Sequence, residues 1–176
     1  ISFAVEQGEI FGLIGPDGAG KRTLFRILTT LLLADKGTAT VNGLDVVTDY
    51  KLIRTKVGYM PGRFSLYQDL SVEENLEFFA TVFHTSIQEN YDLIKDIYQQ
   101  IEPFKKRRAG ALSGGMKQKL ALSCSLIHKP DILFLDEPTT GVDPVSRKEF
   151  WQMLRNLRKQ GITIIVSTPI MDEARQ

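Results

Sequence analysis

Residues 10–21 read Ile10-Phe11-Gly12-Leu13-Ile14-Gly15-Pro16-Asp17-Gly18-Ala19-Gly20-Lys21. The short apolar run that ends in glycines indicates a buried strand entering a turn. A helix is predicted next, over residues 23–33. A strand, a glycine-rich turn and a helix in this order, with lysine at the end of the turn, are typical of a loop that holds phosphate groups.

The predicted phosphate loop can bind a nucleoside triphosphate through its backbone. Glycines let N–H groups close around phosphate oxygens, and the helix N-terminus adds a positive dipole. Lys21 can reach the terminal phosphates. A glycine-rich turn without a ligand is the plainer alternative, and a dinucleotide-binding turn would order its glycines differently. The candidate nucleotide-binding residues are Gly15, Pro16, Asp17, Gly18, Ala19, Gly20, Lys21, Arg22 and Thr23.

Position 22 departs from the phosphate-loop pattern, which places Ser or Thr directly after the lysine to ligate Mg²⁺. Here the residue is Arg22, which cannot ligate a cation and lies at the positive end of the helix dipole. Thr23 follows about 100° further around the helix, so it cannot simply take over the role. Two alternatives stay open: Arg22 turns outward, or it pairs with phosphate directly.

A second apolar strand, predicted over residues 132–135, runs into two acids, Asp136 and Glu137. Ligands bind beyond the carboxyl ends of strands in open α/β sheets, so Asp136 is a candidate Mg²⁺ ligand. Glu137 is placed to polarise a water molecule against a γ-phosphate, which makes it the candidate catalytic residue. Two acids after a strand are common, so a strand followed by a polar loop is the alternative.

The rest of the chain alternates between strand-like and helix-like segments. Strands are predicted at 38–41, 57–60 and 162–167, and helices at 72–83, 91–101, 115–127 and 144–160. Ser71 and Glu74 fit a capping box at the start of the first of these helices, and Asp143 is the expected cap of the last. Continuous apolar strands separated by helices favour a parallel sheet covered on both faces. The stretch 64–129 lacks such strands, so we expect it to be an inserted helical subdomain within a single domain of residues 1–176.

Composition narrows the functional classes. The chain has 176 residues, of which 22 are basic and 21 acidic, so no strong field points to nucleic acid or to an anionic lipid surface. Its single cysteine, Cys124, favours a reducing compartment. The apolar runs are far shorter than the roughly 20 residues that span a bilayer. The chain begins at Ile1 inside an apolar run, and we interpret it as a fragment of a longer protein whose membrane work, if any, lies elsewhere.

A third motif lies between the phosphate loop and the acidic strand and reads Leu112-Ser113-Gly114-Gly115-Met116-Lys117-Gln118. Ser113 and the N–H groups of Gly114 and Gly115 open a helix and can contact a γ-phosphate. An ordinary Ser-capped helix is the alternative, but the position of the motif argues against it. With this motif the chain resembles the ATP-binding subunits of ABC transporters, whose signature reads LSGGQ or a close variant.

The resemblance covers almost the whole chain, and residues 140–144 are similar to the D-loop of that family, which implies that Asp143 is a further nucleotide-binding residue. It implies a three-layer α/β P-loop NTPase core with a mainly parallel sheet, an inserted helical subdomain and a partial N-terminal antiparallel β subdomain. It further implies ATP and Mg²⁺ as cofactors and a head-to-tail dimer with a second ABC ATPase domain. Each ATP site then joins the phosphate loop of one domain to the signature of the other.

The amino-acid sequence of these motifs is most similar to that of exporters whose ATPase chain carries two such domains in tandem. The resemblance therefore implies a motor domain that couples ATP hydrolysis to solute export. It also implies transmembrane permease subunits as partners and a cytoplasmic place on the inner face of the plasma membrane. No nucleic-acid partner is expected. A soluble ABC ATPase of translation or DNA repair is a further alternative, although such proteins usually carry different insertions between phosphate loop and signature.

Two more positions depart from the family pattern. Gly62 stands where the family has a Gln that senses Mg²⁺ and the attacking water, and Pro169 stands where it has a His that contacts the γ-phosphate. Together with Arg22, they predict an impaired half-site beside an intact signature. The alternative to a hydrolysing motor is therefore a non-hydrolysing regulatory half that supports the ATPase site of a partner.

Overall fold

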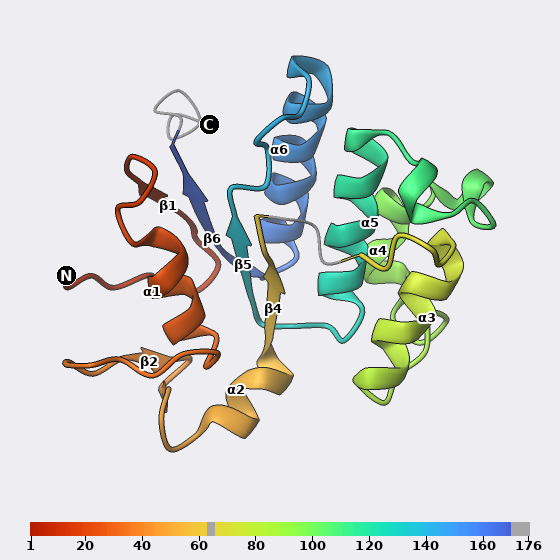
Figure 1. Cartoon of the computed structure of the whole chain (residues 1–176). Helices are drawn as coiled ribbons and strands as arrows, with labels where there is room; N and C mark the ends of the chain where they lie inside the picture. Colours follow the sequence, from red (N-terminus) through yellow and green to blue (C-terminus); the bar gives the residue numbers. More distant parts are fainter. Residues whose placement is uncertain (63–65, 170–176) are drawn as a thin grey trace.

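The computed structural model describes residues 1–62 and 66–169. Its centre is a four-stranded sheet made of β1 (Ile10–Ile14), β4 (Val57–Met60), β5 (Ile132–Asp136) and β6 (Thr163–Thr168), in the spatial order β1-β6-β5-β4. Every neighbouring pair is parallel, with Ile10 opposite Ile164 and Val57 opposite Ile132. The predicted parallel sheet is confirmed (Figure 1).

Helices lie on both sides of this sheet (Figure 1). They are α1 (Lys21–Leu28), α2 (Tyr50–Lys56), α3 (Val72–Val82), α4 (Tyr91–Tyr98), α5 (Gly114–Leu126) and α6 (Pro144–Lys159), with single 3₁₀ turns η1 (Glu102–Phe104) and η2 (Ala109–Ala111). A short antiparallel ribbon, β2 (Thr40–Val41) with β3 (Leu44–Asp45), follows α1. The chain therefore has the α/β fold expected, including a small antiparallel part.

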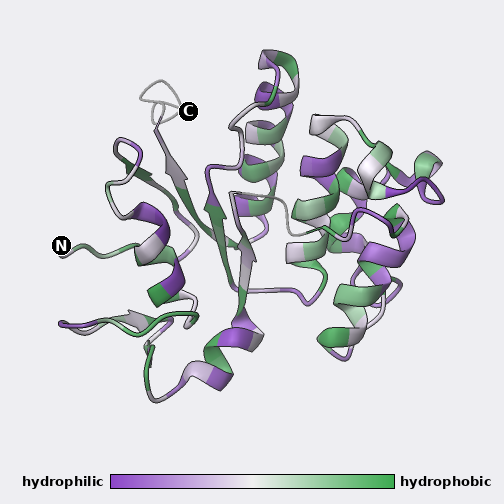
Figure 2. Cartoon of the chain, in the orientation of Figure 1, coloured by the Kyte–Doolittle hydropathy of each residue, from purple (hydrophilic) through white to green (hydrophobic). Residues whose placement is uncertain are grey.

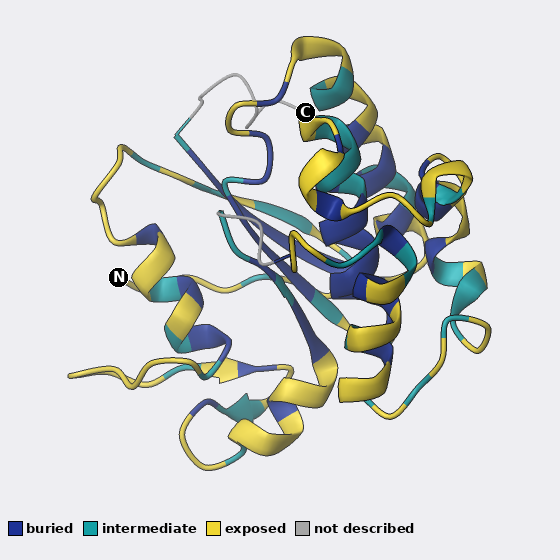
Figure 3. Ribbon diagram, turned by 45° about the vertical axis from the view of Figure 1, so that its right-hand side comes forward, coloured by how far each residue is buried: buried dark blue, intermediate teal, exposed yellow. Residues whose placement is uncertain are grey.

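The sheet separates two apolar clusters because successive strand residues point to opposite faces. Ile165 packs with Phe25 of α1 and Phe134 on one face, whereas Ile164 packs on the other face in a cluster with Leu154 of α6. Figure 3 shows the central strands mostly buried between the outer elements, and Figure 2 shows hydrophobic residues along β1 and β5. This rigid centre holds the carboxyl ends of the strands in place.

Helix starts agree with the sequence because their caps are local. Ser71 and Glu74 form the predicted capping box of α3, with the Ser71 N–H donating to Glu74 Oε2 at 2.7 Å and the Glu74 N–H donating to Ser71 Oγ at 3.2 Å. Asp143 caps α6 by accepting the N–H groups of Val145 and Ser146, both at 3.0 Å.

Helix ends agree less well. The helix predicted over residues 23–33 stops at Leu28, because Thr30, directly after the C-cap Thr29, adopts a φ of 62° that an α-helix does not continue through. The helix predicted over 91–101 likewise stops at Tyr98. The elements α2 and β3 were not predicted.

The residues described between β4 and β5 form α3, α4, α5 and the turns η1 and η2. Helix α5 packs on α3 and α4 on one side and on β4 on the other, so it joins this helical region to the sheet. The boundary of the predicted subdomain at 64–129 stays a prediction, and residues 64 and 65 lie outside the described part. Among the described residues, none of the helices has the length and apolarity needed to cross a membrane.

Gly58 is required where β4 meets α5. An added Cβ would collide with the carbonyl oxygen of Ser125 and lie 2.9 Å from Leu133 Cδ1. We expect Gly58→Ala to lower the free energy of unfolding by about 1–3 kcal/mol or more, as overpacking against backbone does. Gly12→Ala in β1 is the matched control, because its Cβ meets nothing within 4 Å. Urea unfolding of both variants is the measurement, and equal midpoints would contradict this packing.

Candidate functional site

The phosphate loop lies between β1 and α1, at the carboxyl edge of the sheet. The N–H of Gly15 donates to the carbonyl of Thr168 at 3.4 Å, which ties the start of the loop to the end of β6. Gly18 and Gly20 have φ of 78° and 87°, a region that L side chains rarely adopt. Gly20 is also the N-cap of α1, so the loop's glycines set the backbone that opens the helix.

Lys21 is the buried cation of this loop, with 7% of its surface exposed. Its ammonium donates to the carbonyls of Gly15 at 2.7 Å and Pro16 at 2.9 Å. The same nitrogen lies 3.7 Å from Glu137 Oε1 at the end of the acidic strand. The structure therefore brings the predicted lysine and the predicted catalytic carboxylate to one point.

Asp136 is fully buried at the end of β5, and both of its carboxylate oxygens have protein partners. Ser167 Oγ donates to Oδ1 at 2.7 Å, and Arg22 Nε donates to Oδ2 at 2.6 Å. The hydrogen bond from Arg22 to Asp136, together with the negative charge of Asp136, raises the pKa of the guanidinium above its usual value. Of the two open alternatives for Arg22, neither describes this inward pairing with a carboxylate.

Gly62, shortly after the end of β4, packs against that ion pair. A Cβ at position 62 would lie 2.9 Å from Arg22 Nη2 and 2.9 Å from the carbonyl oxygen of Asp136. A hollow of about 290 Å³ adjoins the pair, lined by Arg22, Arg26, Leu31, Tyr59, Pro61 and Gly62. Burial and the charge of Asp136 raise the pKa of the Tyr59 hydroxyl, so Tyr59 is a neutral wall of this hollow.

The residues present do not fit the Mg²⁺ that the family implies. Both Asp136 oxygens are engaged, one of them by a cation, and the position after Lys21 offers a guanidinium in place of a hydroxyl oxygen. In the part of the chain that the structure describes, His, Cys, Asp and Glu side chains form no group of three that could hold a metal ion. Metal binding by Asp136 stays a prediction.

Glu137 has a φ of 50°, which is uncommon for a residue with a side chain and is typical of functional turns. Its N–H donates to the carbonyl of Ser167 at 3.0 Å and to Ser167 Oγ at 3.1 Å. These bonds fix the turn so that the side chain faces Lys21. Pro169 follows β6 nearby in sequence and offers no hydrogen-bond donor at the position where the family has His.

The signature lies at the start of α5, on the other side of the central strands from α1 (Figure 1). Ser113 caps the helix by accepting the N–H of Met116 at 3.3 Å, and Gly114 is exposed. A Cβ at Gly115 would lie 2.9 Å from Ser146 Oγ, so this glycine lets α5 approach α6 closely.

Asp143 is the remaining predicted site residue. Its carboxylate accepts the N–H of Ser146 at 3.0 Å. Hydrogen bonds from the side chain and backbone of Ser146 hold the pKa of the Asp143 carboxyl below its usual range. Asp143 and the signature thus occupy two neighbouring helix starts, apart from the cluster formed by Lys21, Arg22, Asp136 and Glu137.

Two residues near the site were missed from the sequence. Ser167 bridges Asp136 and the backbone of Glu137, and its only signal was a polar residue near the end of an apolar strand. Gln118, which is 1% exposed in α5, donates from Nε2 to the carbonyl of Pro138 at 2.6 Å. It links the signature helix to the turn that carries Glu137.

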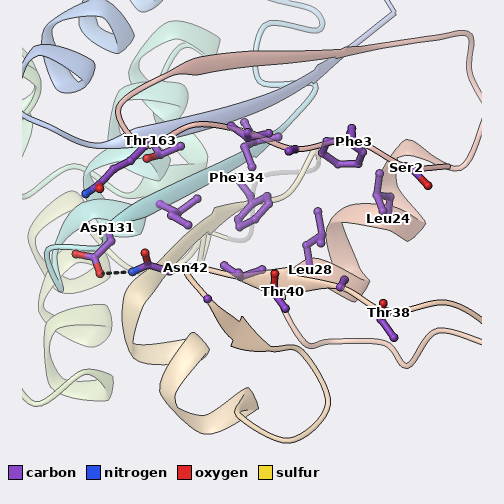
Figure 4. Close-up of a pocket in the computed structure, with 18 of the residues that line it drawn as sticks. Ser2, Phe3, Leu24, Leu28, Thr38, Thr40, Asn42, Asp131, Phe134 and Thr163 are labelled. Carbon is purple, nitrogen blue, oxygen red and sulfur yellow. Dashed lines mark hydrogen bonds between the residues drawn. The ribbon is translucent and has the colours of Figure 1, made fainter.

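A larger hollow of about 530 Å³ lies elsewhere, between the N-terminal segment, α1, β2 and the α1 face of the sheet (Figure 4). Phe3, Leu24 and Phe134 give it an apolar wall, and the hydrogen bond from Asn42 to Asp131 lies at one end. It contains no residue of the phosphate loop, so size alone does not mark the functional site here.

Comparison with known proteins agrees with the geometry. A family model described as "ABC transporter" matches residues 1–140. The chain is 45% identical over 174 residues to the probable multidrug ABC transporter ATP-binding protein YbhF of Escherichia coli, covering 98% of this chain and 30% of that protein. It is 40% identical over 178 residues to the Nod factor export ATP-binding protein I of Burkholderia lata, covering 100% of this chain and 59% of that protein.

A solved structure is also similar: the dimeric structure of MJ0796, a bacterial ABC transporter cassette. Its TM-score is 0.85 at 25% identity, and the match covers 98% of this chain and 80% of that one. The chain spans 30% of the length of YbhF and 59% of the length of the Nod factor export protein. With its phosphate loop, acidic strand and signature in place, the chain belongs to the ABC transporter family and is an ABC-type ATPase domain.

Proposed function

We propose that this chain is an ATP-binding motor domain of an ABC exporter and that its own half-site hydrolyses ATP poorly. The exporter assignment is supported by the names of the two relatives, one of which is a multidrug transporter protein and the other a Nod factor exporter. The single observation that carries the impairment is the ion pair between Arg22 and Asp136 at 2.6 Å.

The phosphate loop supplies nucleotide binding. In the structure, the Lys21 ammonium donates to two loop carbonyls. Charged phosphate oxygens accept stronger hydrogen bonds than neutral carbonyls, so a bound phosphate can take their place. The glycine-rich backbone of residues 15–20 and the start of α1 direct N–H groups at the same phosphates. Thr23 is exposed one residue beyond Arg22 and completes the candidate loop.

Glu137 is proposed as the residue that orients a water molecule. Its carboxylate lies 3.7 Å from the Lys21 ammonium, so a terminal phosphate held by Lys21 lies beside it. A carboxylate there can accept a proton from the attacking water. No step is assigned to Mg²⁺, because the residues present do not fit the ion.

Three departures weaken hydrolysis at this half-site. Arg22 neutralises Asp136, Gly62 has no side chain to position water, and Pro169 has no donor for a γ-phosphate. Ser113, Gly114 and Gly115 are proposed to serve the ATP of a second ABC ATPase domain. Dimeric assembly of MJ0796 supports such a partner.

Assembly with transmembrane permease subunits on the cytoplasmic face is proposed on the same basis. One structural neighbour is cbiO1 of Clostridium perfringens, which is described as part of the ABC transporter complex cbiONQ. Its TM-score with this chain is 0.83 at 27% identity, and the match covers 98% of this chain and 71% of that chain. The membrane-spanning segments of such subunits would select the transported solute.

The steady-state ATPase rate of the purified chain tests the proposal. We expect turnover far below the median enzyme value of about 10 per second. A rate near that value would contradict the impairment. Glu137→Gln is the control, because it removes the proposed water-orienting carboxylate while keeping a side chain of similar shape.

A second candidate function is a regulatory half that binds ATP without hydrolysing it. The ion pair that neutralises Asp136 favours this candidate. Comparing the ATPase rates of the wild type and Glu137→Gln distinguishes it from a weak motor. A slow rate that Glu137→Gln abolishes identifies a weak motor. Equal background rates in both proteins identify the regulatory half.

A further inference from the structure

Asp136 needs a positive partner because it is a fully buried carboxylate. Burying an ionised carboxylate without compensation is strongly unfavourable. Ser167 supplies a neutral hydrogen bond at 2.7 Å, and Arg22 supplies the charge at 2.6 Å. The compensating cation at this carboxylate is therefore part of the chain itself.

The backbone around the ion pair is shaped to admit it. Gly62 has no side chain, and a Cβ there would lie 2.9 Å from Arg22 Nη2. The same Cβ would lie 2.9 Å from the carbonyl oxygen of Asp136, so both members of the pair fill the space over this glycine. Arg22 and Gly62 come from different elements, α1 and the end of β4, and together they form one packed arrangement.

A divalent ion and this arrangement exclude each other. An ion bound to Asp136 Oδ2 would take the place of a guanidinium that already donates to that oxygen, and it would face the positive charge of Arg22. The oxygen ligand that a hydroxyl at position 22 would offer is missing as well.

We propose that Arg22 is a built-in cation that stands in for Mg²⁺, so that this half-site binds ATP without a divalent ion. The inference rests on the proposed nucleotide binding and goes beyond it, because it names the form of nucleotide that is bound. The ligand is free ATP⁴⁻ rather than the Mg²⁺ complex.

The guanidinium has the donors for this task. Arginine carries five N–H donors in a fixed fork, and only Nε is used on Asp136. The side chain of Arg22 is 56% exposed, so it is accessible to a ligand although Nε is held by Asp136. An arginine presents its N–H groups to phosphate oxygens in pairs, and it does so one residue after Lys21.

Titration of the purified chain with ATP by calorimetry tests the inference directly. One series contains excess EDTA, and the other contains excess Mg²⁺. We expect ATP to bind more weakly in excess Mg²⁺ than in EDTA, because Mg²⁺ converts free ATP into the complex that this site does not accept. A wild-type affinity that is equal in the two series, or higher with Mg²⁺, would overturn the inference.

Arg22→Thr is the informative variant, because it returns a hydroxyl to the position after Lys21 and removes the cation. We expect its affinity for ATP in EDTA to fall about tenfold or more and its affinity to become dependent on Mg²⁺. Arg26→Thr is the matched control. Arg26 is exposed one turn further along α1 and lines the same hollow, but it makes no ion pair among the described residues. It should bind ATP as the wild type does.

The outcomes separate this inference from the proposed function. Strict dependence on Mg²⁺ in the wild type keeps nucleotide binding and refutes the built-in cation. Absence of ATP binding in both series refutes nucleotide binding and the inference with it. The wild-type series needs no substitution, so it decides the question even if Arg22→Thr leaves Asp136 unpaired and fails to fold.

Discussion

Gly114→Asp is expected to abolish ATP-driven dimerisation and to leave ATP binding by the single chain nearly unchanged. Gly114 is exposed at the start of α5, and an added Cβ meets nothing within 4 Å, so the fold accommodates the new side chain. A carboxylate at a helix N-terminus is itself favourable. It would nevertheless place a negative charge where the γ-phosphate of a partner's ATP docks, and like charges oppose that contact.

The measurement is paired: ATP affinity of the monomer, and the ATP-dependent dimer fraction by light scattering together with the ATPase rate of the assembled transporter. Gln99→Asp is the charge control, because Gln99 is exposed at the end of α4 and lies outside the signature. Loss of monomer binding with normal assembled turnover would show that the signature serves the chain's own nucleotide.

Lys21→Gln is expected to weaken ATP binding by about 10- to 100-fold, which corresponds to losing a charged hydrogen bond of about 1.5–3 kcal/mol. Lys21 is buried in the loop with its ammonium on two carbonyls, so it is already confined at the phosphate position. Gln keeps a polar tip but not the charge that attracts the β- and γ-phosphates.

Equilibrium titration with ATP measures this loss, and thermal unfolding without nucleotide shows whether the variant is folded. Lys36→Gln, an exposed lysine beyond α1, removes the same formal charge and should bind normally. Equal ATP affinity in Lys21→Gln and the wild type would mean that the loop does not hold phosphates.

The fold was predictable where local signals act alone. Apolar strands β5 and β6 and the caps Ser71 and Asp143 depend on neighbouring residues, and all four appear where the sequence places them. The end of α1 was not predictable, because Leu31, Leu32 and Leu33 continue an apolar run that the backbone turn at Thr30 takes out of the helix.

The candidate site was predictable as a set of residues but not as an arrangement. The motifs identify Lys21, Asp136 and Glu137 by type and spacing. The ion pair of Arg22 with Asp136 spans 114 positions and depends on the helix phase of α1, the end of β5 and the space over Gly62. Sequence reasoning marked Arg22 and Gly62 as two separate losses, whereas the structure places them in contact across the same carboxylate.

The central claim, that this chain binds nucleotide through its phosphate loop, is tested most directly by titration with ATP, ADP and AMP under one condition. We predict one ATP bound per chain, ADP binding at a similar site, and AMP binding at least about 100-fold more weakly, because AMP lacks the phosphates that Lys21 and the loop N–H groups hold. Saturable binding that does not distinguish ATP from AMP, or no ATP binding at all, would contradict the account.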